Sequence, residues 1–259
     1  MSRREVILRI LEEQSFISVR SLQRETGASP ATIRRDIDKL DKAGAAKKVH
    51  GGVASLLKPG AGRKSVSHPF VENIDICVEE KKAIAEVAGT LVRDGSIILI
   101  HGGSTCFYLG RMIAQRNVRV ITHSMPLACY LSDHGTCQLT VGGGDLHREP
   151  GILFDPSANR RNDFAAQFFV GGLGVGEEGI LESNPLLIRQ SREMSAIATE
   201  TIVLVDSRKF DERPPTVAMT FDKVDKLITD DGLSDKHAKM LKDQGVTFLV
   251  ADTKRDPHA

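Results

Sequence analysis

The fold is decided first by residues 18–40, SVRSLQRETGASPATIRRDIDKL. Ser18 stands at the start of an apolar helical period, where its hydroxyl can cap a helix, and Gly27 stands where that helix must turn sharply. A second helix then begins with Ser29 as its N-cap and Pro30 in the first helical position, where the missing N–H costs nothing. The stretch therefore predicts a helix-turn-helix that binds DNA.

The second helix has two chemically different faces. Ile33, Ile37 and Leu40 form an apolar stripe, and the opposite face carries hydroxyl and cationic groups that suit base edges and phosphates. The alternative is an ordinary amphipathic helix pair with a solvated charged face, but the coincidence of caps, glycine turn and clustered arginines favours DNA binding. We expect the DNA-binding residues to be Ser18, Ser29, Ala31, Thr32, Arg34, Arg35, Lys39, Lys47, Lys48 and His50.

The flanking segments complete a small domain. A further helix is expected over residues 3–13, and Gly44 is expected to end the second helix of the pair. Residues 45–49 and a segment from Val53 predict two short strands, joined by a turn at residues 50–52. Three helices and a short hairpin make a winged helix-turn-helix, expected over residues 1–57.

Charge is distributed unevenly along the chain of 259 residues. Residues 1–58 hold 12 Lys and Arg against 7 Asp and Glu, which gives +5, and residues 59–259 hold 23 against 27, which gives −4. Cationic side chains release condensed counterions from a phosphate backbone, so the basic N-terminal part alone suits DNA.

Composition separates two domains. Residues 58–65 are rich in Gly, Pro and charge and predict a linker, expected over 58–74. An effector-binding domain is expected over 75–252, followed by a tail at 253–259. The composition, 41% hydrophobic and 27% charged, is that of a soluble globular protein. Without an apolar run of membrane-spanning length or a signal-like segment, we expect a cytoplasmic protein with no membrane partner.

The cysteines carry no metal or redox signal. Cys77, Cys106, Cys129 and Cys137 lack a C-x-x-C spacing, so we expect reduced, mostly buried thiols, with no metal and no cofactor.

The C-terminal part alternates strands and helices. Helices are expected at residues 79–92 and 106–115, and strands at 96–100 and 118–122. Further strands are expected at 138–141, 168–170, 201–205, 226–228 and 247–250. This pattern predicts an α/β domain with a largely parallel sheet covered on both faces.

Ligands of such sheets bind beyond the carboxyl ends of the strands. Residues 102–105, GGST, lie between a strand and a helix, where glycine amides, two hydroxyls and the helix dipole suit a phosphate. A single glycine pair is usually a tight turn, but several such strand ends and the cations Arg208 and Lys209 favour a phosphorylated small molecule. We expect the effector-binding residues to be His101, Gly102, Gly103, Ser104, Thr105, His123, Ser124, Gly143, Gly144, Asp206, Ser207 and Lys209.

These motifs resemble the DeoR family of bacterial transcriptional regulators over nearly the whole chain. The similarity is carried by SPATIRRDIDKLDKAGAAKKVHGG near the N-terminus, and by HGGST, VITHSMPLA, VGGGDL, VLVDSRKF and LITDD further on. GSTCFYLGRMI and MPLACYL most resemble the branch that represses L-ascorbate utilisation. The resemblance implies a Rossmann-like sensor domain similar to ribose-5-phosphate isomerase.

The resemblance also implies a function. It is that of a repressor of a sugar or sugar-acid catabolic operon, released from double-stranded operator DNA by a phosphorylated sugar intermediate, and acting as a homo-oligomer, a dimer or a tetramer. By matching position, Thr32, Arg34 and Arg35 fall on the recognition helix, residues 102–105 on the phosphate loop, and Asp206, Ser207 and Lys209 on the pocket.

Three positions depart from the family pattern. Many members have Asp at the position of His101, Asn at that of His123, and an acidic residue at that of Leu173. The two histidines either contact the effector or are buried imidazoles bonded to backbone, and they lack a third ligand for a metal.

Two other functions are weighed against a regulator. A sugar-phosphate isomerase needs a positioned carboxylate base, which the aliphatic Leu173 does not supply, although Asp145 or Glu177 could substitute. A structural nucleoid protein would not need a large sensor-like domain.

Overall fold

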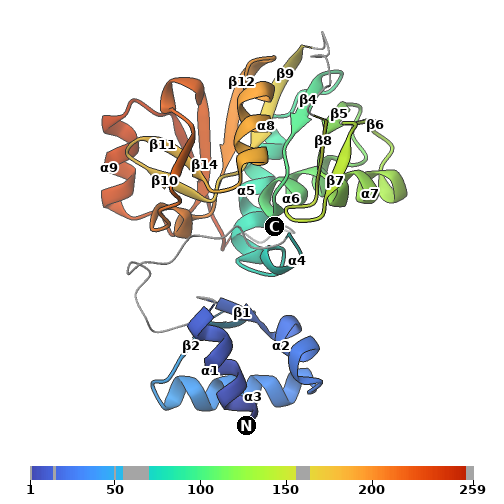
Figure 1. Ribbon diagram of the computed structural model, residues 1–259. Coiled ribbons are helices and arrows are strands. Elements are labelled where there is room, and N and C mark those ends of the chain that lie inside the picture. Colours follow the sequence, from blue (N-terminus) through green and yellow to red (C-terminus); the bar gives the residue numbers. More distant parts are fainter. Residues whose placement is uncertain (1, 14–15, 50, 55–69, 156–163, 255–259) are drawn as a thin grey trace. The chain divides into compact units, whose positions relative to one another are not determined.

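The computed structural model describes residues 2–13, 16–49, 51–54, 70–155 and 164–254 (Figure 1). The chain divides into two compact units. The first holds the described residues up to 54 together with Val71–Val78, and the second holds Phe70 and the described residues from Glu79 onward. Most of the expected linker, 58–74, lies outside the described residues. The domain limits expected from the sequence stay predictions.

The first unit is a winged helix-turn-helix. Its elements are α1 (Arg3–Glu13), β1 (Phe16–Ser18), α2 (Val19–Thr26), α3 (Pro30–Lys42), β2 (Lys47–Val49) and β3 (Gly52–Ala54). One apolar core holds them together, with side chains from every helix; Ile7, Leu22 and Ile33 are fully buried in it. The three helices and the hairpin predicted from the sequence are confirmed.

Two details of this unit differ from the prediction. The wing is a three-stranded sheet in the order β1-β3-β2, because Phe16–Ser18 pairs antiparallel with Gly52–Ala54. Strand β2 begins at Lys47 rather than at residue 45, because the N–H groups of Ala45 and Ala46 donate to the carbonyl of Leu40 and close the end of α3.

A short helix, α4 (Phe70–Asn73), precedes α5 (Val78–Leu91). Part of the expected linker is therefore helical. The ring of Phe70 packs edge-to-face on that of Phe107, with centroids 5.2 Å apart.

The second unit is built on a seven-stranded sheet in the order β15-β14-β12-β9-β4-β5-β6, and all its strand pairs are parallel. The predicted parallel sheet is confirmed. Its strands, in sequence order, are β4 (Ile97–Ile100), β5 (Arg119–Thr122), β6 (Gln138–Val141), β9 (Ala165–Val170), β12 (Ala198–Leu204), β14 (Lys226–Asp230) and β15 (Phe248–Ala251).

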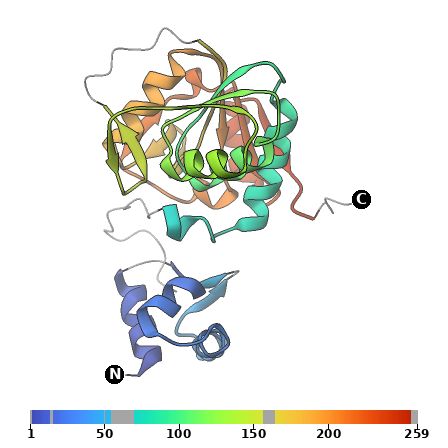
Figure 2. The same ribbon diagram turned by 90° about the vertical axis from the view of Figure 1, so that its right-hand side faces the viewer.

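Helices cover the sheet on both faces (Figures 1 and 2), and consecutive strand residues belong to the cores on opposite faces. Ile98 and Ile100 join a core with α5, α6 (Ser104–Ile113) and α7 (Met125–His134), whereas Leu99 joins a second core with α8 (Pro185–Ser195) and α9 (Asp235–Asp243). Both faces are apolar and covered, which explains the continuous apolar strands.

Several smaller elements were not predicted, because each is too short to show a hydrophobic period. They are the hairpin of β7 (Asp145–His147) and β8 (Ile152–Phe154), the small sheet of β10 (Gly174–Gly176), β11 (Gly179–Glu182) and β13 (Thr216–Met219), and the 3-10 turns η1 (Ser207–Phe210) and η2 (Phe221–Lys223). Helix α6 begins at Ser104, two residues before the predicted start, because Gly103 at φ 116° takes the N-cap position. No helix among the described residues is long and apolar enough to cross a membrane.

Candidate DNA-binding surface and effector site

The helix-turn-helix is fixed by local hydrogen bonds at its helix ends. Ser18 Oγ accepts the N–H of Ser21 at 3.0 Å and caps α2, and Gly27 ends that helix in the left-handed region at φ 65°. Ser29 Oγ accepts the N–H of Thr32 at 3.3 Å and caps α3. The predicted caps are confirmed. The Ser18 side chain is 4% exposed, so its hydroxyl is committed to the fold.

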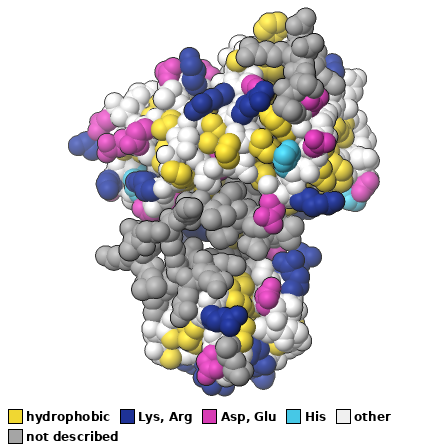
Figure 3. All heavy atoms as spheres, viewed as in Figure 1, with side chains coloured by type: hydrophobic (Ala, Val, Ile, Leu, Met, Phe, Trp, Pro, Cys, Tyr) yellow, Lys and Arg dark blue, Asp and Glu magenta, His cyan; other side chains and the backbone are white. Residues whose placement is uncertain are grey.

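The exposed face of α3 carries the predicted recognition residues. Ala31, Arg34, Arg35 and Lys39 are exposed, and Thr32 is half-buried. The opposite face is held in the core by the predicted apolar stripe. Lys and Arg side chains are visible along the lower edge of this unit, where α3 lies (Figure 3).

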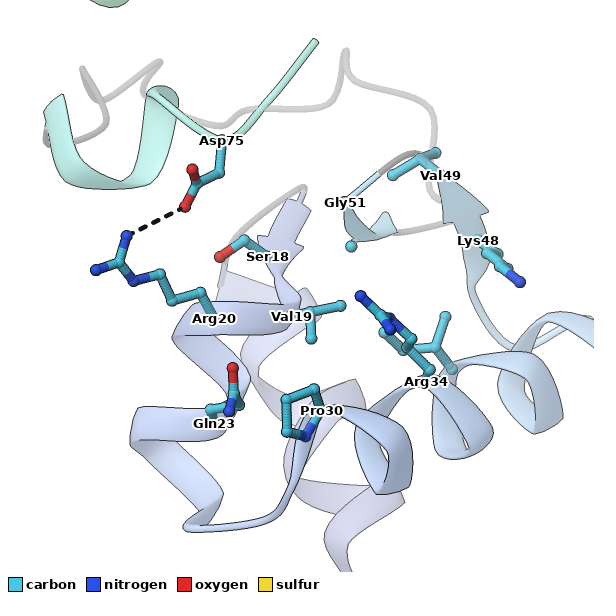
Figure 4. A pocket seen from close by; sticks show the side chains of 12 residues that line it. Ser18, Val19, Arg20, Gln23, Pro30, Arg34, Lys48, Val49, Gly51 and Asp75 are labelled. Carbon is cyan, nitrogen blue, oxygen red and sulfur yellow. Dashed lines mark ion pairs between the residues drawn. The ribbon is translucent and has the colours of Figure 1, made fainter. Parts of the chain in front are cut away.

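The wing brings two more cations beside α3. Lys47 is exposed, and Lys48 Nζ pairs with Asp38 Oδ1 at 2.7 Å. The hydrogen bond from Lys48 lowers the pKa of Asp38 below its ordinary value. His50 lies outside the described residues, so its expected contact stays a prediction. The start of α2, the face of α3 and the wing surround a hollow of about 600 Å³, into which Arg34 points (Figure 4).

In the second unit, the parallel sheet brings the predicted strand ends to one edge. His101 follows β4, His123 follows β5, Gly142 follows β6, and Asp206 lies two residues after β12. The chain runs outward from β4 through β5 to β6 in one direction, and from β9 through β12 to β14 in the other. The strand order therefore reverses between β4 and β9, and the crevice beyond such a reversal is where open α/β sheets bind ligands.

His101 lies at this reversal and is 4% exposed. Its backbone N–H donates to the carbonyl of Phe169 at 2.9 Å, which joins the ends of β4 and β9. Burial, as the larger cause, and the nearby His123 together lower the pKa of His101 to about 4, although a hydrogen bond with the backbone of Gly102 acts in the opposite direction. His101 is therefore neutral near pH 7. Its Nε2 atom is buried with no hydrogen-bond partner among the described residues.

The phosphate-loop residues stand at the start of α6. Gly103 takes the N-cap position without a side-chain cap, so the first N–H groups of the helix receive no hydrogen bond from the side chain of their N-cap residue. Gly103 is exposed, and Ser104 and Thr105 are 9% and 8% exposed. An uncapped N-terminus of this kind suits an anion, since its amide dipoles point outward.

The other predicted loop residues pack against protein. Ser124 caps α7, and its N–H donates to Thr122 Oγ1 at 3.0 Å. The ring of His123 occupies the place of a Cβ on Gly142, and the backbone of Phe154 occupies that of Gly144, which has φ 105°. The first two glycines are explained by close packing, whereas a Cβ on Gly143 would meet no atom within 4 Å.

Asp206 lies within a group of cations. Its side chain is 2% exposed and accepts hydrogen bonds from Arg208 at 2.8 and 3.2 Å. Burial alone would raise the pKa of Asp206, but Arg208, Lys209 and Lys81 hold it below its ordinary value. Lys81 comes from α5 and is itself 2% exposed. Asp230 on the next strand accepts the N–H of Ser207 at 2.7 Å and holds η1 in place.

Two buried charged residues of this group were not predicted, Lys81 and Glu182. Glu182 Oε1 accepts the N–H groups of Ser183 and Asn184 at 2.7 and 3.1 Å. Burial raises the pKa of Glu182, while these N–H groups and Lys209 act in the opposite direction. Lys81 lies at the end of the first turn of α5 and Glu182 at the end of β11, a strand of four residues. Neither position carried a sequence signal that its side chain is buried.

Leu173 and the four cysteines were singled out for enzyme and metal chemistry. Leu173 is a buried apolar residue, 8% exposed, and its backbone N–H donates to the carbonyl of Leu181 at 3.0 Å. The two carboxylates that could substitute for it, Asp145 and Glu177, are exposed. None of the four cysteines forms a disulfide. Only Cys106 is buried, Cys77 and Cys137 are half-buried and Cys129 is exposed, so the expectation of mostly buried thiols is wrong. Among the described residues, no group of three or more His, Cys, Asp or Glu could hold a metal ion.

A DNA-binding winged helix joined to an α/β domain with a charged edge is the architecture of a transcription regulator with a sensor domain. A family model described as "DeoR-like helix-turn-helix domain" matches residues 3–58, and one described as "DeoR C terminal sensor domain" matches residues 76–231. The chain belongs to the DeoR family.

Relatives and solved structures were also found. The chain is 32% identical over 248 residues to the HTH-type transcriptional regulator UlaR of Escherichia coli (strain K12 / DH10B), covering 95% of this chain and 97% of that protein. UlaR of Shigella boydii serotype 18 matches equally. Ribose 5-phosphate isomerase A of Methanocaldococcus jannaschii overlaps 50% of this chain and 53% of its own, at 22% identity and a TM-score of 0.37. Because the relatives are HTH-type regulators, the chain is a DNA-binding transcriptional regulator, and the isomerase and nucleoid alternatives are set aside.

Proposed function

We propose that this regulator represses a sugar or sugar-acid catabolic operon and is released from its operator by a phosphorylated sugar intermediate. The observation that carries the proposal is the surroundings of Asp206, where Arg208, Lys209 and Lys81 act on one buried carboxylate. Three cations therefore lie at the ligand-binding edge of the sheet beside the carboxylates of Asp206, Glu182 and Asp230, and a cationic side chain there can form a charge-assisted hydrogen bond with a phosphate. The uncapped start of α6 on the same edge adds amide donors.

In this proposal the effector contacts are Lys209, Ser207 and the residues 102–105, with His101 and His123 beside the sugar. Lys81 joins them through its proximity to Asp206. Release requires that the effector bind the weakly DNA-binding conformation more tightly, because a ligand shifts only an equilibrium between states that it binds unequally.

We further propose that the protein acts in the cytoplasm as a homo-oligomer. Palindromic operators present paired half-sites, and paired winged helices are needed to occupy both.

The test is fluorescence anisotropy of labelled DNA from upstream of the protein's own gene. The complex is challenged with sugar phosphates, including L-ascorbate 6-phosphate, each beside its unphosphorylated form. Release by one phosphorylated compound alone supports the proposal and identifies the pathway. Tight, sequence-specific binding that no compound disturbs would refute the effector part and leave the DNA-binding class unchanged.

A further inference from the structure

The hollow of the first unit is lined by cationic side chains and by one acidic side chain. Arg20 on the first turn of α2, Arg34 on α3 and Lys48 on β2 all line it (Figure 4). Asp75, from the segment Val71–Val78 that belongs to this unit, lines it as well.

Asp75 is placed by two contacts. Its Oδ2 lies 3.9 Å from Nη1 of Arg20, with the two side chains 38% and 70% exposed, respectively. Its backbone carbonyl lies 2.9 Å from the position that a Cβ on the wing residue Gly51 would take. Gly51 accepts the N–H of Val19 at 2.9 Å, so the wing, the start of α2 and Asp75 form one packed group.

Arg20 is in a position to contact a DNA phosphate. In a helix-turn-helix the first helix of the pair crosses the DNA backbone while the second enters the major groove. Arg20 is on that first helix, is mostly exposed, and lies on the same hollow as Arg34 of the recognition helix. The guanidinium of arginine pairs with carboxylate and with phosphate oxygens through the same N–H donors. The carboxylate of Asp75 can therefore take the place of a DNA phosphate beside Arg20.

We propose that Asp75 is an internal competitor for DNA phosphate at Arg20, an autoinhibitory contact that lowers the affinity of the regulator for DNA. An exposed ion pair is weak, so DNA displaces it, and its loss raises affinity by about two- to fivefold. The competition takes place without the effector. It affects the contact of Arg20 with the DNA phosphates, which does not depend on the DNA sequence.

The experiment measures the binding of the full chain to a labelled duplex of mixed sequence, about 20 bp long. Four proteins are compared at low salt: wild type, Asp75→Asn, Arg20→Gln and the double variant. Asp133→Asn is the matched control, because Asp133 is an exposed carboxylate on α7 and gives the same change in net charge. Asp75→Glu keeps the charge and serves as a second variant.

We expect Asp75→Asn to bind about two- to fivefold more tightly than wild type, with the gain shrinking as salt screens the pair. Asp133→Asn and Asp75→Glu should bind like wild type. In the Arg20→Gln background, Asp75→Asn should bring no gain. An unchanged affinity of Asp75→Asn would overturn the proposal, as would an equal gain in Asp133→Asn or in the Arg20→Gln background, because either shows a general effect of charge. Failure of the wild type to bind any duplex would instead count against DNA binding itself.

Discussion

Arg208 donates two hydrogen bonds to Asp206, from Nε to Oδ1 at 2.8 Å and from Nη2 to Oδ2 at 3.2 Å. The two residues belong to the sequence DSRK, residues 206–209, which includes the proposed effector contacts Ser207 and Lys209. The guanidinium fork of Arg208 is occupied by a neighbouring carboxylate, whereas Lys209, the next residue, lies near Glu182. The two adjacent cations have different surroundings, and we expect different consequences when each is removed.

Lys209→Ala should keep DNA affinity and lose the response to the effector, because Lys209 belongs to the second unit and its ammonium is proposed to pair with the phosphate of the effector. Anisotropy of the DNA complex, with and without the compound that releases wild type, measures both properties. Lys239→Ala, which removes an exposed cation from α9, is the matched control and should respond like wild type. Normal release of the Lys209→Ala complex would remove Lys209 from the site.

Arg208→Ala should destabilise the second unit by about 1 to 3 kcal/mol near pH 7, because a buried carboxylate loses its charged hydrogen-bond donor. The pKa of Asp206 is held below its ordinary value in the folded state, so this stabilisation is complete above about pH 3.9 and is lost as the pH falls further. Urea denaturation should thus show a difference in the free energy of unfolding between wild type and Arg208→Ala that becomes smaller below about pH 4. If this difference in the free energy of unfolding stays constant below about pH 4, Arg208 stabilises the protein by packing and not by charge.

His101 predicts a second pH dependence, at milder acidity. Its pKa is about 4 in the folded protein and about 6.5 in an unfolded chain, so the unfolded state binds more protons between these values. Stability falls as the pH falls from 6.5 towards 4, by about 2 kcal/mol between pH 7 and pH 5 for this residue alone. Urea denaturation at the two pH values should show a smaller loss for His101→Gln than for wild type. His134→Gln, at an exposed position on α7, should keep the wild-type loss. If His101→Gln loses as much stability as wild type between pH 7 and pH 5, the pKa of His101 is not lowered by folding.

The parts of the fold that were predicted correctly depend on local chemistry. Ser18 and Ser29 cap their helices through bonds to N–H groups three residues away, and Gly27 turns the chain by itself, so each signal lies within a few residues. The edge of the sheet was also predictable, because parallel strands bring their carboxyl ends together whatever their spatial order.

The parts that were missed depend on contacts distant in sequence. β1 is a strand because its residues pair with β3, for example Ser18 with Gly52, and the sequence of a three-residue strand does not indicate which strand it pairs with. Lys81 belongs to a charged run, VEEKK, that is typical of a solvated helix face, and only the placement of α5 near Asp206 buries it. The ion pair of Arg20 with Asp75 joins positions on either side of the expected linker, a relationship that no local pattern carries.

The two adjacent arginines of the recognition helix should differ in the kind of DNA contact that they make. Arg34 lines the hollow between α2, α3 and the wing, whereas Arg35 is exposed on α3 and does not line it. An arginine that hydrogen-bonds a guanine edge contributes about 1 to 3 kcal/mol and discriminates between sequences, whereas one that contacts phosphate weakens binding to all sequences equally. We expect Arg34→Ala to weaken binding to upstream DNA and to mixed-sequence DNA alike, and Arg35→Ala to reduce the ratio between them.

The measurement is the affinity of each variant for both duplexes over a range of salt. Loss of a phosphate contact lowers the slope of log K against log salt by about one, and loss of a base contact changes it less. Arg189→Ala, an exposed arginine of α8 in the second unit, is the control and should leave both affinities unchanged. The opposite result, with specificity lost in Arg34→Ala and kept in Arg35→Ala, would show that the hollow faces the bases and that Arg35 contacts the backbone.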